Sequence, residues 1–372
     1  ISLMLTILLA VALSPLATSA APTTRPVGDL PQEPLFVSGQ GGYHTYRIPS
    51  LLVTRSGAVL AFAEGRKAGR GDSGDIDIVM RRSDDGGRTW SEMRTIFDDD
   101  ANTVGNPCPV VDRRTGTIHM LLTWNLGTDT EKMIKAGASR DTRRVWVSRS
   151  DDDGRTWTKP RDITADTKRD DWTWYATGPG VGIQTRSGRL IIPCDNALAG
   201  TQAWHAHTIY SDDGGETWRV GGVTGRDMNE CQVVERGDGS LLLNMRSYRG
   251  RHLRAVSVST DGGLTWSEPR DDPALVEPVC QAALIRYSDE KPDWLLFSNP
   301  ADTKRVRMTL RLSRDGGQTW PHARLLHEGP SAYSALAVTA DGTILCLYER
   351  GRRDAYETIT LARLRLNDIT DE

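Results

Sequence analysis

The sequence is poor in cysteine, and its few cysteines follow no pattern that would build a disulfide framework or a zinc site. The 372 residues include only Cys108, Cys194, Cys231, Cys280 and Cys346, which are scattered and never in C-x-x-C spacing. A disulfide scaffold or a structural zinc site needs closely spaced, paired cysteines. The 7 histidines show no ligand spacing either. We therefore expect buried free thiols, no metal and no organic cofactor.

An excess of charge of one sign is also lacking. Lys and Arg number 46 and Asp and Glu 49, which gives a formal net charge of -3, and no run of Lys or Arg forms a basic arm. A nucleic-acid or anionic-membrane surface needs such a basic patch, so this balance argues against both partners. With 38% hydrophobic and 26% charged residues, the composition is that of a soluble globular protein. An anionic ligand would have to be held locally.

The first 20 residues carry no charge at all. The apolar run Leu3–Leu13, followed by Pro15 and small residues, is too short for a membrane span and is typical of a secretory signal peptide. Because the chain starts at Ile1 without a basic segment, we expect residues 1–20 to be a signal peptide truncated at its N-terminus. We expect an exported protein, periplasmic or secreted, with no membrane span in the mature chain. Residues 21–34 are predicted to be a linker and residues 35–372 a single domain.

What the sequence does contain is a repeated octapeptide, S-x-D-x-G-x-T-W. It begins at Ser83, Ser150, Ser211, Ser259 and Ser313. Each residue type suits a tight turn between strands, because the Asp carboxylate accepts backbone N–H groups, Gly tolerates positive φ and Trp packs the turn onto its neighbours. A spacing of roughly 50 to 70 residues is typical of propeller blades and other repeat architectures.

Hairpins that are apolar on both arms lie between these turns. We expect them at residues 48–63, 109–124, 182–193, 231–245, 282–297 and 335–348. Continuous apolar runs indicate strands covered on both faces. Each of the first five hairpins leads through a third strand into the octapeptide turn and a fourth strand, whereas the sixth lacks that turn. We therefore predict an all-β, six-bladed β-propeller of four-stranded antiparallel blades, the last closed by the N-terminal strand Leu35–Ser38. A seven-bladed ring or an open solenoid are the alternatives.

The antiparallel strand order predicts which residues share a face. The starts of first strands, the ends of second strands and the starts of third strands lie together, opposite the octapeptide turns. Three arginines from different blades converge on this face. Their like charges repel and are costly to bury unless an anion binds between them. A carboxylate is a suitable anion, because the guanidinium group binds it with two parallel hydrogen bonds. The polar residues of this face are Arg47, Glu230, Tyr333, Glu64, Arg66, Arg246, Glu349, Arg305, Asp72 and Asp75.

Several motifs in order give this pattern a family likeness. They are Y-R-I-P at Tyr46–Pro49, the repeated Asp box, N-E-x-x-V at Asn229–Val233, L-x-x-R at Leu243–Arg246, R-V-x-x-T-x-R-x-S at Arg305–Ser313 and S-x-Y-S at Ser331–Ser334. From about residue 40 to 350 the chain resembles the bacterial exo-α-sialidase (neuraminidase) family with Asp-box (BNR) repeats. The Asp box alone is weak support, because it also occurs in propellers without this activity.

The resemblance implies a role for each matching residue. Arg47, Arg246 and Arg305 would bind the substrate carboxylate, Tyr333 would be the nucleophile, Glu230 its base and Asp72 the acid/base. Glu349 would orient Arg47, and Arg66 would support the site. The implied enzyme is a monomeric retaining glycoside hydrolase that releases terminal sialic acids from glycoproteins, glycolipids or oligosaccharides through a covalent tyrosyl intermediate. Sialidases with a tyrosine nucleophile are a known exception among glycosidases.

Some alternatives stay open at the level of sequence. Arg307 or Arg311 could take the place of Arg305, because a two-residue slip keeps the same strand face. Asp75 or Asp77 could take the place of Asp72. A trans-sialidase or a catalytically silent sialoglycan-binding propeller are the alternative functions, and the full set of Tyr333, Glu230 and Asp72 argues against the silent one.

Overall fold

The structure is a computed structural model that describes residues 23–25, 28, 30–201 and 203–370. The predicted signal peptide, residues 1–20, lies outside the described residues. Strands dominate, and the helices of the described part are short: α1 (Glu131–Lys135), α2 (Thr164–Thr167) and the 3-10 helix η1 (Leu366–Asp368). None of these helices is long and apolar enough to cross a membrane. The fold class is therefore all-β, as predicted.

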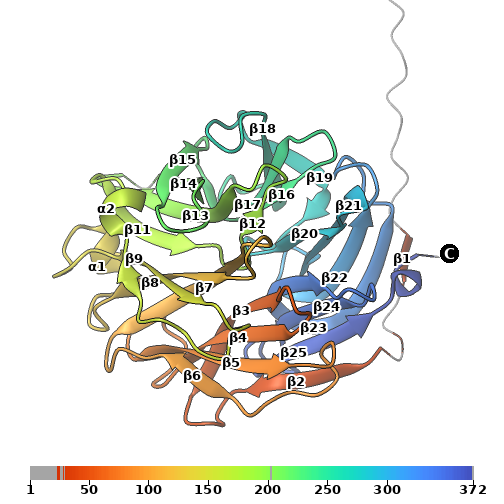
Figure 1. The fold of residues 1–372 in the computed structure, drawn as a ribbon, viewed down its shortest axis with the longest axis horizontal. Coiled ribbons are helices and arrows are strands. Elements are labelled where there is room, and N and C mark those ends of the chain that lie inside the picture. Colours follow the sequence, from red (N-terminus) through yellow and green to blue (C-terminus); the bar gives the residue numbers. More distant parts are fainter. Residues whose placement is uncertain (1–22, 26–27, 29, 202, 371–372) are drawn as a thin grey trace, which may run out of the picture.

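The strands form antiparallel groups of four that follow one another along the chain (Figure 1). The first group is β3 (Thr45–Val53), β4 (Val59–Arg66), β5 (Ile76–Ser83) and β6 (Arg94–Phe97). The second is β7 (Thr103–Val111), β8 (Ile118–Asn125), β9 (Arg144–Ser150) and β10 (Arg161–Asp162). In the third, two short strands share one partner: β11 (Trp172–Thr177) and β12 (Ile183–Gln184) both pair with β13 (Leu190–Leu198), which is followed by β14 (Trp204–Ser211) and β15 (Arg219–Val223).

The remaining groups complete the sequence. The fourth is β16 (Met228–Glu235), β17 (Leu241–Ser247), β18 (Leu253–Ser259) and β19 (Arg270–Val276). The fifth is β20 (Ala283–Ser288), β21 (Lys291–Pro300), β22 (Val306–Ser313) and the first half of β23 (His322–Val338). The second half of β23 begins the sixth group, with β24 (Ile344–Arg350), β25 (Thr358–Leu364) and β2 (Gln32–Val37).

The N-terminal strand joins the C-terminal group, as the sequence predicts. β2 pairs antiparallel with β25, with Phe36 opposite Ile359 and Val37 opposite Thr358. In the stretch predicted to be a linker, residues 23–25 form β1 (Thr23–Arg25), which pairs in parallel with the start of β23. Both N-terminal strands therefore attach to C-terminal strands, β1 to β23 and β2 to β25.

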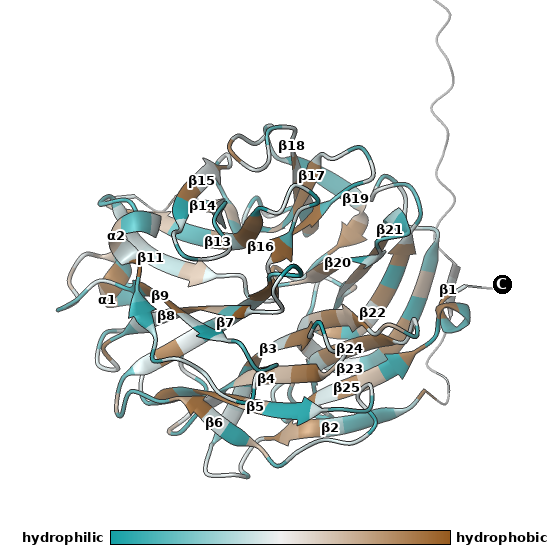
Figure 2. Ribbon diagram, viewed as in Figure 1, coloured by the Kyte–Doolittle hydropathy of each residue, from teal (hydrophilic) through white to brown (hydrophobic). Residues whose placement is uncertain are grey.

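The inner strands contact one another in a closed order. β3 contacts β7, β7 contacts β12 and β13, β13 contacts β16, β16 contacts β20, β20 contacts β23, and β23 returns to β3. Each pair of neighbouring groups encloses its own hydrophobic cluster, including one shared by the first and sixth groups, with Val59, Ala61, Leu345 and Leu361. Figure 2 shows hydrophobic stretches on inner strands such as β16 and β20. Because both faces are covered, these strands read as continuous apolar runs.

The octapeptide turns brace the third and fourth strands of a group. In the turn at Ser211, Thr217 donates its backbone N–H to Asp213 Oδ1 at 3.0 Å and its hydroxyl to Asp213 Oδ2 at 2.5 Å. Gly215 has φ of 90°, and a Cβ there would lie 2.2 Å from the His119 ring of the preceding group. Trp218 is buried against the same histidine. The predicted role of this motif as a turn that packs onto its neighbours is confirmed.

Candidate active site

One cavity of about 290 Å³ collects the polar residues that the sequence places on a single face. Of the predicted site residues, Arg47, Arg66, Asp72, Glu230, Arg246, Arg305 and Tyr333 line it. Glu349 lies directly behind, fully buried, and holds two of these residues. Residues more than 250 positions apart in the sequence are thus brought together at one end of the inner strands.

Inner strands carry register shifts at the end that faces the cavity. The shifts lie between Arg47 and Ser50 in β3, Gly105 and Cys108 in β7, Met228 and Cys231 in β16, and Ser331 and Ser334 in β23. Ile48 and Asn106, inside two of them, have positive φ of 57° and 52°. An extra residue bends a strand and re-aims the side chains beside it. Positive φ is costly for a β-branched residue, and such strain is concentrated at functional sites.

Tyr333 and Glu230 form the central hydrogen bond of the cavity. The Tyr333 hydroxyl donates to Glu230 Oε1 at 2.5 Å. Arg246 Nη1 donates both to Glu230 Oε2 at 2.8 Å and to the Tyr333 hydroxyl at 3.2 Å. A phenol, a carboxylate able to receive its proton and a cation able to stabilise the phenolate therefore meet at one point. This is the arrangement of a nucleophile with its base.

Burial decides the protonation state of Tyr333. Burial, followed by the negative charge of Glu230, raises the pKa of Tyr333 well above its usual range, although Arg246 and Arg47 act in the opposite direction. The phenol is therefore neutral in the resting site at neutral pH. A neutral phenol is a weak nucleophile unless a neighbouring base withdraws its proton.

Glu349 fixes Arg47 and the backbone around Tyr333. Its Oε1 accepts from Arg47 Nε at 2.7 Å and from the Ile48 N–H at 3.0 Å, and its Oε2 accepts from the Tyr333 N–H at 3.0 Å. The Arg47 guanidinium lies 4.1 Å from the ring centroid of Tyr356 and 5.0 Å from that of Tyr333. One buried carboxylate therefore couples an arginine of the first group to a tyrosine of the sixth.

Among the arginines near the start of β22, only Arg305 lines the cavity. Arg305 Nη1 donates to the Tyr356 hydroxyl at 2.8 Å. Arg307 instead pairs with Glu328, and Arg311 is buried and donates to Asn299 Oδ1 at 2.9 Å. Of these three arginines, Arg305 is therefore the one placed to meet a ligand in the cavity.

Asp72 lies at the rim of the cavity, with its side chain 56% exposed. Arg66 Nη1 contacts its Oδ1 at 2.8 Å, and the same arginine donates to Glu64 Oε2 through Nε and Nη2. Burial would raise the pKa of Asp72, but the charges of Arg66 and Arg47 outweigh it and lower that pKa. Asp75 contacts Lys67, and Asp77 accepts from Tyr43 and contacts Lys67 outside the cavity. Asp72 is thus the best-placed candidate acid.

Trp174, an aromatic residue of the face that the sequence predicts for sugar contacts, lines the cavity, as does Asn229 of the N-E-x-x-V motif. Further residues line the cavity that the sequence did not single out: Asn106, Glu131, Arg143, Asp195, Trp204, Tyr248 and Tyr356. Arg143 is buried, lies 3.9 Å from the Trp174 ring centroid and donates to Asn106 Oδ1 at 2.5 Å. Arg143 lies just before β9 and Asp195 near the end of β13, on the predicted face. The strand order places both residues on the predicted face, but neither belongs to the sequence motifs that mark the family.

The described residues contain no group of three or more His, Cys, Asp or Glu side chains placed to hold a metal ion. All five cysteines are free and buried, which confirms that prediction.

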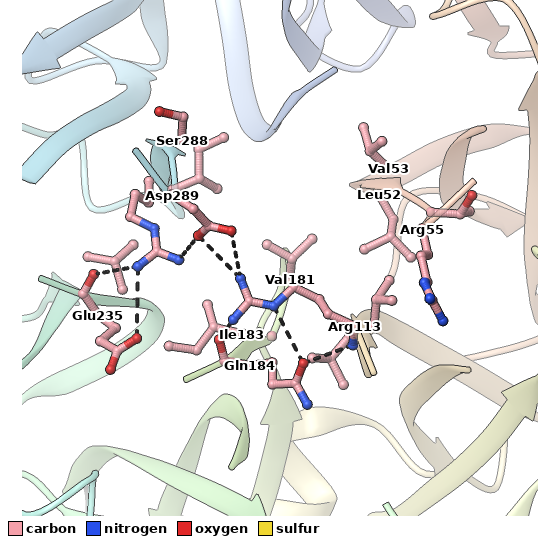
Figure 3. A pocket seen from close by; sticks show the side chains of 17 residues that line it. Leu52, Val53, Arg55, Arg113, Val181, Ile183, Gln184, Glu235, Ser288 and Asp289 are labelled. Carbon is pink, nitrogen blue, oxygen red and sulfur yellow. Dashed lines mark hydrogen bonds and ion pairs between the residues drawn. The ribbon is translucent and has the colours of Figure 1, made fainter. Parts of the chain in front are cut away.

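A second cavity, of about 490 Å³, lies at the opposite ends of the inner strands (Figure 3). Its walls are apolar, with Leu52, Val110, Val181, Ile183, Val234 and Ile285. Arg113 reaches across its mouth to Asp289 and also donates to Gln184 (Figure 3). The predicted site residues are not among those that line it, so we assign the chemistry to the first cavity.

Known proteins resemble this chain over most of its length. The family model "BNR repeat-like domain" matches residues 57–346. The chain is 37% identical over 356 residues to a sialidase of Micromonospora viridifaciens, covering 90% of this chain and 54% of that protein. It is 33% identical over 366 residues to an exo-alpha-sialidase of Aspergillus fumigatus, covering 88% of this chain and 86% of that protein. The chain thus spans only about half the length of the Micromonospora relative.

Solved structures share the fold. The Hadza microbial sialidase Hz136 superposes with a TM-score of 0.83 at 35% identity, covering 91% of this chain and 69% of that one. Trypanosoma rangeli sialidase in complex with sialic acid gives a TM-score of 0.75 at 20% identity, over 91% of this chain and 59% of that one. At such low identity the second likeness is one of fold.

Proposed function

The chain belongs to the sialidase family with BNR repeats, and from this premise we propose that it is an exo-α-sialidase. It would remove terminal α-linked sialic acids from glycoproteins, glycolipids or oligosaccharides with retention of configuration. The single observation that carries the proposal is the 2.5 Å hydrogen bond from Tyr333 to Glu230 inside a cavity lined by arginines.

We also propose that the strand groups are the six blades of a β-propeller. The closed order of inner-strand contacts, the hydrophobic cluster shared by the first and sixth groups, and the pairing of β2 with β25 support this ring. In a β-propeller the inner strands surround one central channel, and their corresponding ends open at the same mouth of that channel. That geometry would explain how side chains from separate blades reach one substrate.

The arginines suit the substrate's carboxylate. Arg47, Arg246 and Arg305 line the same cavity, and a planar guanidinium binds a carboxylate bidentately. Partner contacts already hold each of them in place: Glu349 holds Arg47, Glu230 holds Arg246 and Tyr356 holds Arg305. A preorganised cationic wall would place the anomeric carbon, which bears the carboxylate, beside Tyr333.

The carboxylate on the anomeric carbon explains the use of a phenol. An Asp or Glu nucleophile would approach a like charge, whereas neutral Tyr333 does not. In the first step, the Tyr333 oxygen bonds to the anomeric carbon while its proton passes to Glu230. The glycosidic C–O bond breaks, and Asp72 protonates the leaving oxygen. Water then attacks the same carbon, gives a proton to Asp72 and displaces Tyr333, which recovers its proton from Glu230. Two inversions give retention.

The lowered pKa of Asp72 requires that substrate binding prepare the acid. In the free site Arg66 and Arg47 favour the ionised carboxyl. A bound sialic acid would bring its own carboxylate to Arg47 and exclude water from the rim. Both effects raise the pKa of Asp72, so the protonated acid would be populated mainly in the complex.

The deciding experiment measures fluorophore release from an α-sialoside by the purified protein and by Tyr333→Phe. We expect turnover by the wild type and a loss of at least about a thousandfold in kcat in the variant, since the covalent route needs the phenol oxygen. No turnover by the wild type between pH 4 and pH 8 would refute the enzyme assignment. Unchanged turnover in the variant would refute the nucleophile.

Product analysis by NMR completes the test. Retention predicts that the α anomer of free sialic acid is formed first. Formation of the β anomer first would refute retention. A transfer product formed in place of free sialic acid in the presence of a lactose acceptor would identify the trans-sialidase alternative.

A further inference from the structure

Asp195 is a buried carboxyl in the cavity wall that the mechanism above does not use. It lies on β13, is fully buried, and lines the cavity. Its Oδ1 accepts from Asn229 Nδ2 at 2.9 Å. Its other oxygen, Oδ2, is buried and has no hydrogen-bond partner among the described residues. A buried polar atom without a partner costs free energy, so Oδ2 of this cavity-lining residue calls for a partner that the described residues do not supply.

The surroundings of Asp195 favour the neutral acid. Burial, followed by the negative charge of Glu230, raises the pKa of Asp195 well above its usual range. Glu131 acts in the same direction, whereas Arg246 and Arg143 act against it. Neither arginine comes within ion-pair distance of Asp195 in the described structure; Arg246 pairs with Glu230, and Arg143 donates to Asn106 and Tyr175. Since Asn229 donates to Oδ1, the proton belongs on Oδ2.

We propose that Asp195 acts as a neutral hydrogen-bond donor that recognises an uncharged oxygen of the bound sugar, on the side opposite the sugar's carboxylate. This inference rests on the proposed function. A carboxylic acid that stays protonated because of its apolar site can serve as a donor inside an active site. The amide analogue of such a residue keeps the same hydrogen-bonding pattern.

The position of Asp195 in the ring indicates which part of the sugar it meets. Asp195 belongs to the third strand group and Tyr333 to the sixth, and in the six-bladed ring proposed above these two groups would face each other across the axis. Tyr333 attacks the carbon that bears the carboxylate. The far side of the pyranose ring carries the amide and the hydroxylated three-carbon tail, whose oxygens are all uncharged. A protonated acid donates to such oxygens without the repulsion or desolvation cost of a charge.

Aromatic and small side chains also stand beside Asp195. Ala176 on β11 is its partner in register, and Trp174, two residues earlier on the same strand, lines the same cavity. Arg143 lies over the Trp174 ring and is occupied by its own hydrogen bonds. A donor at Asp195 would give direction to the bound sugar, because few precisely placed polar groups fix the orientation of a ligand in a cavity.

The test compares wild type, Asp195→Asn and Asp195→Ala on a fluorogenic α-N-acetylneuraminide. We expect Asp195→Asn to keep kcat/KM within about threefold, because the amide accepts from Asn229 and donates toward the sugar. Asp195→Ala should lose about 10- to 100-fold, the usual effect of removing one buried hydrogen-bonding group from a site. A loss in Asp195→Asn equal to that in Asp195→Ala would overturn the neutral donor. Unchanged kcat/KM in Asp195→Ala would overturn any contact with the sugar.

Truncated substrates separate a sugar contact from a merely structural role. We would measure Asp195→Ala against a sialoside with a shortened tail and against a deaminated sialoside. If Asp195 donates to the tail or to the amide, its loss should shrink to less than about threefold with the substrate that lacks that acceptor. A loss of equal size with all three substrates would show that Asp195 only supports Asn229 and Glu230, and would overturn the proposal.

Asp272→Ala is the matched control. Asp272 is also a buried acid whose pKa is raised by burial, but it lies on β19 outside the cavity. We expect its kcat/KM per folded molecule to equal that of the wild type. If the wild type itself fails to turn over sialosides, the proposed function fails. Calorimetric titration of N-acetylneuraminic acid into the wild type and both Asp195 variants then still tests the donor, since weakened binding in Asp195→Ala alone supports it and equal binding in all three overturns it.

Discussion

Glu349→Gln is the sharpest test of how the site is held together. Glu349 is fully buried and accepts three hydrogen bonds, from Arg47 Nε, the Ile48 N–H and the Tyr333 N–H. Glutamine has nearly the same shape but only one oxygen. If that oxygen faces Arg47 and Ile48, the amide NH2 faces the Tyr333 N–H, and two donors oppose each other. The reverse orientation leaves Arg47 and Ile48 without an acceptor.

The magnitude follows from these contacts. Leaving one buried donor without a partner costs about 1–3 kcal/mol. Removing the charge of one member of a buried ion pair costs about 3–5 kcal/mol when its partner stays buried. Arg47 keeps its contacts with the Tyr356 and Tyr333 rings, which offsets part of that cost. We therefore expect Glu349→Gln to lower the free energy of unfolding by about 3 kcal/mol.

Urea unfolding followed by tryptophan fluorescence measures this loss. Glu328→Gln is the control, because Glu328 pairs with Arg307 at the surface, with its side chain 65% exposed, and such pairs contribute at most about 1 kcal/mol. Folded Glu349→Gln should also show a KM for α-sialosides raised on the order of tenfold, since Arg47 loses the contact that orients it. A loss of stability no greater than that of Glu328→Gln would refute the reasoning.

Three further predictions rest on other contacts. Arg305→Lys should raise KM about 10-fold or more because lysine lacks the guanidinium fork, whereas Arg307→Lys should leave KM within twofold; equal KM values would contradict the assignment. Asp213→Ala should lower the free energy of unfolding in urea by about 1 kcal/mol without changing kcat/KM, because the turn is outside the cavity, and a fall in kcat/KM per folded molecule would contradict this. Burial raises the pKa of Tyr46 to about 12, and a tyrosine in the unfolded chain ionises near 10; stability should thus hold below about pH 10 and fall as pH rises toward 12. Tyr46→Phe should flatten this fall in urea titrations at pH 9 to 11, and an equal slope would argue against it.

Much of the fold could be predicted because the octapeptide turn is a local signal. Its Ser, Asp, Gly, Thr and Trp each make the contact that their chemistry suggests, as in the turn at Ser211. The turns mark where third strands become fourth strands, and their absence after β24 pointed to the pairing of β2 with β25. Less local features were missed. Two such features are the pairing of β11 with β13 and the pairing of β1 with β23. No turn motif in the sequence indicates either pairing.

The part of the candidate site that could be predicted from the sequence is its group of arginines. Arg47, Arg246 and Arg305 repel one another unless an anion is bound, so their common strand face was informative without coordinates. Strand order could not choose between Arg305 and Arg307, because the register shifts of β22 against β23 depend on packing that no local motif encodes. The positive φ of Arg307 belongs to the same irregular stretch.

The cavity lining around Asp195 was the part least visible in the sequence, and the reason is physical. Asn106 carries no charge and Asp195 belongs to no cluster of like charges in the sequence, so no electrostatic conflict marks them as a set. Asp195 reads as an ordinary charged residue until its burial and its unpartnered Oδ2 are known. A carboxylate anchor can be inferred from residue types that would otherwise repel, whereas a neutral donor can be inferred only from a hydrogen bond left open in the folded structure.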